Sequence, residues 1–311
     1  MARPPVLCLM GPTASGKTEI ALQLADEFPL DLISVDSALV YRGMDIGTAK
    51  PDADTLRRVP HRLIDIRDPE ERYSAGEFVR DANAAIDSSI ERGRIPLLVG
   101  GTMMYFRALT EGIAELPAAD AGTRAAIDGE AETAGWPAMH RQLAEVDPQA
   151  AARINPNDSQ RIQRALEVYR LSGKSLSAWQ SGIPAERRQE NALKIALIAD
   201  SRATLHARIA TRWQAMLGQG FLDEVRTLMA RPALTATHPS MRAVGYRQMW
   251  SYLAGQDALD DASNKALAAT RQLAKRQHTW LRSERNIVPV NPLENGAIAA
   301  ISALVQTRLK G

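Results

Sequence analysis

The segment from Gly11 to Thr18 has the residue types and spacing of a phosphate-binding loop, or P-loop. Its two glycines let the backbone turn N–H groups toward bound oxygens, Lys17 can reach the outer phosphate oxygens, and the Thr18 hydroxyl can hold Mg²⁺. The predicted diphosphate-binding residues are Gly11, Pro12, Thr13, Ala14, Ser15, Gly16, Lys17 and Thr18, with Thr18 also the metal ligand. The loop alone does not identify the molecule that carries the diphosphate.

A carboxylate, Asp36, ends the second apolar run of the chain, Asp31–Asp36. Ligands of open parallel sheets bind beyond the carboxyl ends of the strands, so we expect Asp36 to share a crevice with the P-loop. It can act there as a base that accepts a proton from an incoming nucleophile. Alternatively, it caps the next turn or orients Lys17 or a Mg²⁺-bound water.

The apolar run Ile95–Gly100 is followed by Gly101 and Thr102, which predicts close backbone approach and a hydroxyl at the same crevice. P-loop ATPases often carry an acidic residue at the end of such a strand to hold Mg²⁺. No acidic residue stands here. This disfavours an ordinary NTPase without excluding ATP.

Two arginines, Arg208 and Arg212, lie four residues apart in a helical pattern that begins after Asp200. Their guanidinium groups can converge on one anion and neutralise a departing phosphate group. The alternative is an ordinary solvated basic face.

The elements that must position these residues alternate between strand and helix patterns. The predicted strands are Val6–Met10, Asp31–Asp36, His61–Ile66, Ile95–Gly100, Leu193–Ile198 and Ile287–Val290. The predicted helices include Thr18–Phe28, Ser74–Gly93, about Asp260–Arg285 and about Gly296–Leu309. We therefore predict an α/β fold, a P-loop NTPase-like parallel sheet flanked by helices, in residues 1–112 and 190–311. Residues 113–189 show no convincing strand and predict an all-helical insertion domain.

Composition restricts the class of protein. The 311 residues include 38 basic and 36 acidic side chains, so any nucleic-acid surface must be local. The single cysteine, Cys8, lies in the first strand pattern, which excludes a disulfide framework and a cysteine zinc site. No apolar stretch has the length of a membrane span or signal peptide, and we expect a soluble cytoplasmic protein.

Three local clusters favour RNA binding, although each alone is compatible with a solvated surface. One is a basic stripe on the late helix, backed by apolar residues that include Ala262 and Trp280. The stripe consists of Arg271, Lys275, His278, Arg282 and Arg285. The others are Asp158–Arg164 and Met241–Gln248, where Tyr246 and Gln248 can stack on and hydrogen-bond to unpaired bases.

Together these residues resemble the tRNA dimethylallyltransferase (isopentenyl-tRNA transferase, MiaA) family. The matching segments are GPTASGKT at 11–18, SVDSALVYRGMDIGTAKP at 34–51, GGTMMY at 100–105, NDSQRIQRALEVYR at 157–170, MRAVGYRQ at 241–248 and TRQLAKRQHTWLR at 270–282. The resemblance implies transfer of a dimethylallyl group from dimethylallyl diphosphate to N6 of the adenosine at tRNA position 37, with release of pyrophosphate. It implies Mg²⁺ as cofactor, and a P-loop that binds the diphosphate of the prenyl donor instead of ATP.

The resemblance also assigns roles. Asp36 would be the general base, while Lys17, Thr18 with Mg²⁺, and Arg212 would stabilise the leaving pyrophosphate, with Arg208 the second choice. Thr102 completes the catalytic set and also contacts tRNA near the target base. The implied tRNA contacts are Asp36, Ser37, Ala38, Leu39, Thr102, Arg124, Gln160, Arg161, Ile162, Gln163, Arg164, Arg242, Ala243, Val244, Gly245, Tyr246, Arg247, Lys275, Arg276, Gln277, His278, Thr279, Trp280, Leu281 and Arg282.

The helical insertion would close over the anticodon stem-loop, and apolar walls would hold the prenyl tail. Eukaryotic members carry a C-terminal zinc finger, whereas this sequence has no cysteine beyond Cys8. We therefore expect a bacterial-type member without a metal finger, and a monomer by default.

Two other functions remain open from the residues. One is a small-molecule kinase that uses ATP, with Asp36 activating an acceptor hydroxyl and the insertion acting as a lid. The other is a nucleotide-gated RNA-binding protein without transferase chemistry. Both predict ATP binding, whereas the transferase predicts use of dimethylallyl diphosphate with tRNA.

Overall fold

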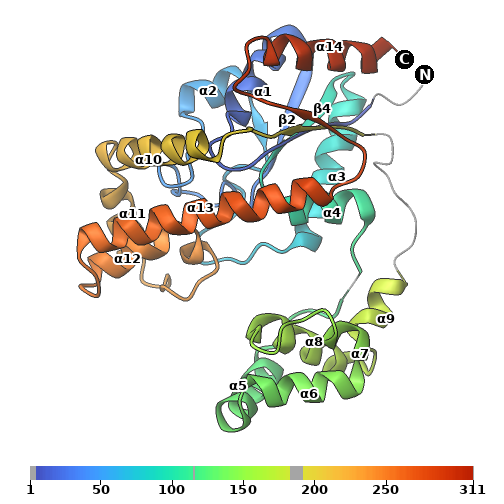
Figure 1. Cartoon of the computed structure of the whole chain (residues 1–311), viewed down its shortest axis with the longest axis vertical. Coiled ribbons are helices and arrows are strands. Elements are labelled where there is room, and N and C mark those ends of the chain that lie inside the picture. Colours follow the sequence, from blue (N-terminus) through green and yellow to red (C-terminus); the bar gives the residue numbers. More distant parts are fainter. Residues whose placement is uncertain (1–4, 115, 183–191, 311) are drawn as a thin grey trace. The chain divides into compact units, whose positions relative to one another are not determined.

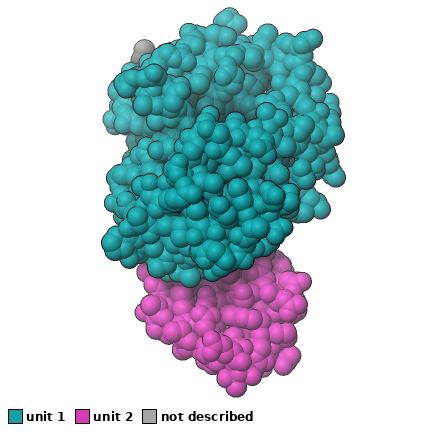
Figure 2. All heavy atoms as spheres, turned by 90° about the vertical axis from the view of Figure 1, so that its left-hand side faces the viewer, with its two compact units in different colours: residues 1–110, 188–311 teal, residues 111–187 magenta. Residues whose placement is uncertain are grey.

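The chain divides into two compact units, which Figure 2 distinguishes by colour. Unit 1 comprises residues 1–110 and 188–311, and unit 2 comprises residues 111–187. The computed structural model describes residues 5–114, 116–182 and 192–310. The expected domain boundary at 112/113 stands two residues from the observed division at 110/111. The other expected boundary, at 189/190, lies outside the described residues.

Unit 1 is built on a six-stranded parallel sheet (Figure 1). Its strands are β1 (Leu7–Met10), β2 (Leu30–Val35), β3 (His61–Arg62), β4 (Ile95–Gly100), β5 (Leu193–Leu197) and β6 (Ile287–Val290), in the order β3-β2-β4-β1-β5-β6. Met10, at the end of β1, pairs with Gly100 of β4 and Ala196 of β5. The P-loop therefore leaves the sheet beside the end of β4, which confirms the predicted fold class.

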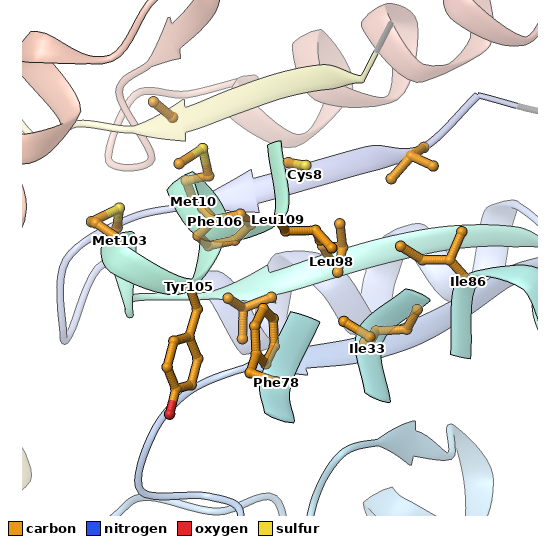
Figure 3. Packing of buried hydrophobic residues seen from close by; sticks show 14 of the residues in the cluster. Cys8, Met10, Ile33, Phe78, Ile86, Leu98, Met103, Tyr105, Phe106 and Leu109 are labelled. Carbon is orange, nitrogen blue, oxygen red and sulfur yellow. The ribbon is translucent and has the colours of Figure 1, made fainter. Parts of the chain in front are cut away.

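Helices cover both faces of this sheet. On one face, α1 (Lys17–Glu27) and α14 (Ala297–Lys310) pack against Leu7 and Leu9. On the other, α3 (Ala75–Glu91) and α4 (Met103–Glu111) pack against Cys8 and Met10 (Figure 3). The period-2 alternation of side chains along β1 produces this division. Burial raises the pKa of the Cys8 thiol to about 12, so Cys8 behaves as a core residue.

Strand β3 is shorter than the predicted His61–Ile66. Leu63 and Asp65 adopt left-handed backbone conformations, with φ of 64° and 55°, which turn the chain away from the sheet. The Asp65 carboxylate accepts a hydrogen bond from the buried ammonium group of Lys50. The short apolar run predicted a strand here, but the residues after Arg62 hydrogen-bond to the loop that follows β2. A short helix, α2 (Ala53–Arg58), precedes it.

A helical layer of unit 1 surrounds a second core. It contains α10 (Arg202–Gly218), α11 (Phe221–Met229), the short η1 (Ser240–Arg242), α12 (Tyr246–Leu253) and α13 (Leu259–Ser283). Helix α13 runs beside α10 and α12 (Figure 1). Trp213, Phe221 and Tyr246 from these helices pack with Tyr41 and Met44 of the loop after β2. This layer therefore holds that loop in place.

Unit 2 contains only helices among its described residues. They are α5 (Ala121–Ala134), α6 (Trp136–Val146), α7 (Pro148–Ala151), α8 (Ser159–Ser172) and α9 (Leu176–Ser181). Ile127, Met139, Leu143 and Ile162 form the centre of its hydrophobic core. Across the described ranges of both units, every helix is too short or too polar to cross a lipid bilayer.

Candidate functional site

The P-loop closes tightly between β1 and α1. The Gly11 N–H donates to the Gly100 carbonyl oxygen at 3.3 Å. Ala14 and Gly16 have positive φ angles of 63° and 90°, and α1 begins at Lys17. The Lys17 ammonium group folds back to donate to the Pro12 carbonyl oxygen at 2.7 Å. The expected strand–loop–helix arrangement is confirmed.

A cavity of about 480 Å³ opens at the carboxyl ends of the strands in unit 1. It brings together residues that the sequence analysis selected from three separate segments, whereas Thr102 is not among its lining residues. Its lining includes Gly16, Lys17, Thr18, Asp36, Arg208 and Arg212. Such a volume is typical of a small-ligand site.

Electrostatics make this cavity suited to an anion. Burial lowers the pKa of Lys17 to about 8; the Asp36 carboxylate opposes this shift and Arg212 adds to it. Burial also lowers the pKa of Arg212, with Asp36 opposing and Arg208 contributing. Lys17 and Arg212 thus share a poorly solvated region with one carboxylate, and the exposed Arg208 lies beside them. A bound diphosphate would compensate for their repulsion and lost hydration.

The structure places both arginines of α10 at the P-loop. The Arg212 guanidinium donates a hydrogen bond to the Thr13 hydroxyl. Arg208 reaches Gly16, where an added Cβ would lie 3.4 Å from its Nη2 atom. Helix α10 presents the two side chains one turn apart, so both can contact one anion bound in the loop.

The structure confirms one of the roles that the sequence left open for Asp36, the cap of the following turn. Its Oδ1 atom accepts the backbone N–H groups of Ala38 at 2.8 Å and Leu39 at 3.4 Å. Asp36 therefore caps the turn after β2, and it also lines the cavity. These two bonds fix the orientation of the carboxylate and both end on Oδ1. Oδ2 is the atom through which a base would act.

Gly100, Gly101 and Thr102, at the end of β4, lie close to the end of neighbouring β2. The Thr102 hydroxyl accepts the Ser37 N–H at 3.1 Å. A Cβ on Gly100 would lie 2.0 Å from the Val35 carbonyl oxygen, and one on Gly101 would lie 2.5 Å from the Gln277 amide nitrogen. The predicted close backbone approach at both glycines is confirmed.

Polar atoms without a partner also mark the cavity. The Ser15 hydroxyl, the Ser34 hydroxyl and the Trp213 indole nitrogen line it, are buried, and have no hydrogen-bond partner within the described residues. Leaving such groups unpaired is costly, so the cavity is preformed for a polar ligand. The hydroxyls of Ser15 and Thr18 are hard oxygen donors that fit Mg²⁺, which usually takes few ligands from the protein. Within the described part of the chain, no group of three or more His, Cys, Asp or Glu side chains is arranged to hold a metal ion.

Glu224 supports the site in a way that the sequence analysis missed. Its carboxylate accepts the backbone N–H groups of Asp45 at 2.9 Å, Ile46 at 2.7 Å and Gly47 at 3.1 Å, and also the Tyr246 hydroxyl. It thereby holds the cavity-lining loop that includes Gly47. Nothing local signals this role, because an acidic residue in the first turn of a helix such as α11 is ordinary.

The predicted contact of Tyr246 and Gln248 with unpaired bases is wrong for these side chains. Both are buried. The Tyr246 ring packs edge-on against Phe221 at 5.0 Å, and the Gln248 amide oxygen accepts the Gly245 N–H at 2.9 Å. The Tyr246 ring gains from burial of its apolar surface, and the hydrogen bond to Gly245 compensates for burial of the Gln248 amide. Arg242 and Arg247 remain exposed.

Helix α13 presents the expected basic stripe except for Arg285, which lies beyond the end of the helix at Ser283. Arg271, Lys275 and Arg282 are exposed, whereas His278 is partly buried. Burial lowers the pKa of His278, with Arg282 and Arg202 contributing.

The apolar side of α13 differs from the prediction. Trp280 is 36% exposed, and the Arg107 guanidinium lies 5.7 Å from its ring centroid. The buried residues in this half of the helix are Ala274, Gln277 and Leu281. The helical period of the sequence pattern placed Trp280 roughly opposite the basic stripe and therefore in the core. In the structure its side chain lies at the surface.

Some of the implied tRNA contacts in unit 2 are exposed, whereas others are buried or paired with residues of the same unit. Gln160 and Arg161 are exposed, whereas the Ile162 side chain is buried in the core and Gln163 donates to Asp128 at 2.6 Å.

Arg124 and Arg164 pair with the fully buried Glu167 carboxylate at 2.9 and 2.8 Å. Burial acts to raise the pKa of Glu167, but hydrogen bonds from these arginines and from the Asp120 N–H hold it below its usual value. Both guanidinium groups thus have a structural role.

Comparison with known proteins gives consistent matches along the chain. A family model described as IPP transferase matches residues 39–284. The tRNA dimethylallyltransferase 2 of Hahella chejuensis is 54% identical, and the match covers 99% of this chain and 97% of that protein.

Comparison with solved structures also finds tRNA-modifying transferases. The crystal structure of a full-length tRNA isopentenylpyrophosphate transferase from Bacillus halodurans matches with a TM-score of 0.72 and 35% identity, covering 98% of this chain and 97% of that one. A eukaryotic dimethylallyltransferase described as acting on tRNA matches with a TM-score of 0.80 at 24% identity, covering 97% of this chain and 78% of that one. This last likeness concerns the fold.

Proposed function

The chain belongs to the tRNA dimethylallyltransferase family, and from this premise we propose that it prenylates N6 of the adenosine at tRNA position 37. The donor is dimethylallyl diphosphate and the second product is pyrophosphate. One observation carries the proposal within the structure. A single cavity contains a P-loop, two arginines and a carboxylate, which are the groups needed to hold a leaving diphosphate and to accept a proton.

The reaction is a substitution at the first carbon of the prenyl donor. N6 of the adenosine attacks this carbon, the N–C bond forms, and the C–O bond to the diphosphate breaks with its electron pair leaving on oxygen. Asp36 accepts the proton that N6 loses. Lys17 and Arg212, with Arg208, stabilise the charge that develops on the pyrophosphate. The adenosine must leave its base stack to reach this cavity.

Mg²⁺ fits the diphosphate end of the cavity. The Thr18 hydroxyl would hold the ion together with oxygens of the diphosphate. When bound, the ion supplies positive charge that balances the leaving group. The Ser15 hydroxyl, which is buried without a partner among the described residues, is available to donate to the diphosphate.

The proposed tRNA surface consists of the exposed basic side chains among the implied tRNA contacts. In unit 1 these are Arg242, Arg247, Lys275, Arg276 and Arg282, and in unit 2 Arg161. They suit the phosphate backbone of the anticodon stem-loop. We place the reaction in the cytoplasm, with the protein acting as a monomer.

The kinase alternative is not favoured, because the highly similar relatives are transferases. The nucleotide-gated RNA-binding alternative is not favoured for the same reason.

The deciding experiment incubates the protein with radiolabelled dimethylallyl diphosphate, Mg²⁺ and tRNA from cells that lack the modification. Label should enter the tRNA, and ATP added in a parallel reaction should not be hydrolysed. The matched control is the same tRNA with guanosine at position 37, which should stay unlabelled. Hydrolysis of ATP without labelling of tRNA would overturn the proposal.

A further inference from the structure

Gln277 has an environment unlike that of its neighbours on α13. Its side chain is only 9% exposed, whereas Lys275, Arg276 and Thr279 beside it are exposed. The amide oxygen accepts the backbone N–H of Thr13 at 2.8 Å, and the amide nitrogen donates to the Gly101 carbonyl oxygen at 2.8 Å. One side chain therefore joins the P-loop to the turn that follows β4.

Packing around Gln277 fixes this arrangement. Ala274, one turn earlier on α13, forms a small cluster with Leu205 and Ile209 of α10, and Ala14 of the P-loop packs against this cluster. Gly101 lacks a Cβ where one would collide with the Gln277 amide. The amide thus occupies a closely fitted position between two backbone segments.

Thr13 is held from two directions. Gln277 accepts its backbone N–H, and Arg212 donates to its hydroxyl. Because Thr13 lies in the loop whose N–H groups face the bound anion, small displacements of Thr13 change the geometry of the whole anion site.

We propose that Gln277 is a positioning residue of the diphosphate site, which locks the P-loop against the β4–α4 turn and makes α13 a structural part of that site. This assigns Gln277 a role other than the tRNA contact expected from its place in the sequence. The proposal rests on the proposed function only for the identity of the anion, a diphosphate.

The chemistry of the two bonds explains why an amide is needed. The position requires one acceptor, for the Thr13 N–H, and one donor, for the Gly101 carbonyl. Methionine has nearly the same length and shape as glutamine but lacks this pair of strong hydrogen-bonding groups. Gln277→Met therefore separates hydrogen bonding from packing. The matched control is Gln272→Met, at an exposed glutamine of the same helix.

The test titrates inorganic pyrophosphate with Mg²⁺ into each folded variant by calorimetry, after circular dichroism has confirmed native helix content. We expect Gln277→Met to bind pyrophosphate about tenfold more weakly than wild type, a change of about 1.4 kcal/mol. Gln272→Met should match wild type within about twofold. A steady-state assay should show a similar rise in KM for dimethylallyl diphosphate, with a smaller change in kcat.

A second titration measures the affinity for the anticodon stem-loop. Gln277→Met should bind this RNA within about twofold of wild type, since the amide is buried against protein. Unchanged pyrophosphate affinity in Gln277→Met would overturn the inference, and so would a loss confined to RNA affinity. Failure of the proposed function is distinguishable, because then the wild-type protein would label no tRNA while the pyrophosphate titration would still report on Gln277.

Discussion

At the scale of single residues, the Asp36 carboxylate has both a structural and a chemical role. Its Oδ1 atom caps the turn after β2, and the same side chain lines the cavity beside Lys17. An alanine at this position would disturb both roles at once. Asparagine keeps the acceptor oxygen for the Ala38 and Leu39 N–H groups and removes only the base.

We therefore expect Asp36→Asn to lower kcat for tRNA labelling by about 10²–10⁴-fold, the usual contribution of a general base. Its tRNA affinity should stay close to wild type, because the turn remains capped. Asp36→Ala should lose the same activity and, in addition, lower the thermal stability. Preserved kcat together with a large loss of tRNA affinity would recast Asp36 as a binding residue.

The lowered pKa of Lys17 predicts how binding of the prenyl donor depends on pH. Burial lowers its pKa to about 8 in the free protein, so the ammonium form is present below that pH and is lost above it. The kcat/KM for dimethylallyl diphosphate should therefore fall as pH rises through about 8. Lys17→Ala should have a low kcat/KM without this decline. A wild-type profile that stays level to pH 9.5 would contradict the assignment.

At the scale of elements, one buried carboxylate contributes to the pairing of α5 with α8 in unit 2, beside the hydrophobic core that the two helices share. Glu167 is fully buried and is neutralised by Arg124 and Arg164. Its charge would be costly without these partners, because desolvation is compensated only by close pairing and hydrogen bonds. The arginines that the family resemblance assigned to tRNA thus have a second, structural reason to be present.

Arg124→Met should destabilise unit 2 by about 2–3 kcal/mol, at or just below the usual cost of breaking a buried pair, because Arg164 still contacts Glu167. Amide hydrogen exchange in α5 and α8 measures this directly. Arg141→Met, at an exposed arginine of α6, is the control and should exchange like wild type. Weaker tRNA binding without faster exchange would instead favour a direct contact by Arg124.

At the scale of the whole molecule, the proposed RNA surface draws on both units. Lys275 belongs to unit 1 and Arg161 to unit 2, and both side chains are exposed. The near balance of 38 basic and 36 acidic residues means that these local surfaces, and not the overall charge, must provide the affinity.

Lys275→Ala and Arg161→Ala should each weaken tRNA binding and reduce its salt slope by about one unit, the effect of losing one phosphate contact. The double variant should show about twice the change, since independent sites add. Lys265→Ala is the charge-matched control, because Lys265 pairs with Asp257 and is not among the proposed tRNA contacts. A double variant no weaker than one of the single variants would remove the other residue from the interface.

The sequence by itself determined the P-loop, the parallel α/β sheet, the helical insertion, the place of Asp36 and the basic stripe of α13. These features depend on neighbouring residues, because strand alternation, helix period and loop chemistry are local properties. Two details of these elements differ from the prediction. Strand β3 ends early because Leu63 has a left-handed backbone conformation, and the Trp280 side chain of α13 lies at the surface.

Only the tertiary structure decided which groups support the site. Thr13 and Gln277 are 264 residues apart, and Gly47 and Glu224 are 177 apart. No periodicity relates such residues, since their contact follows from how α11 and α13 pack against the sheet and its loops. The same packing buried Tyr246 and brought Arg212 to the P-loop. Local sequence patterns therefore predicted which residue types form the site. The geometry of the site depends on contacts between residues that are far apart in the sequence, and these contacts form only when the chain folds.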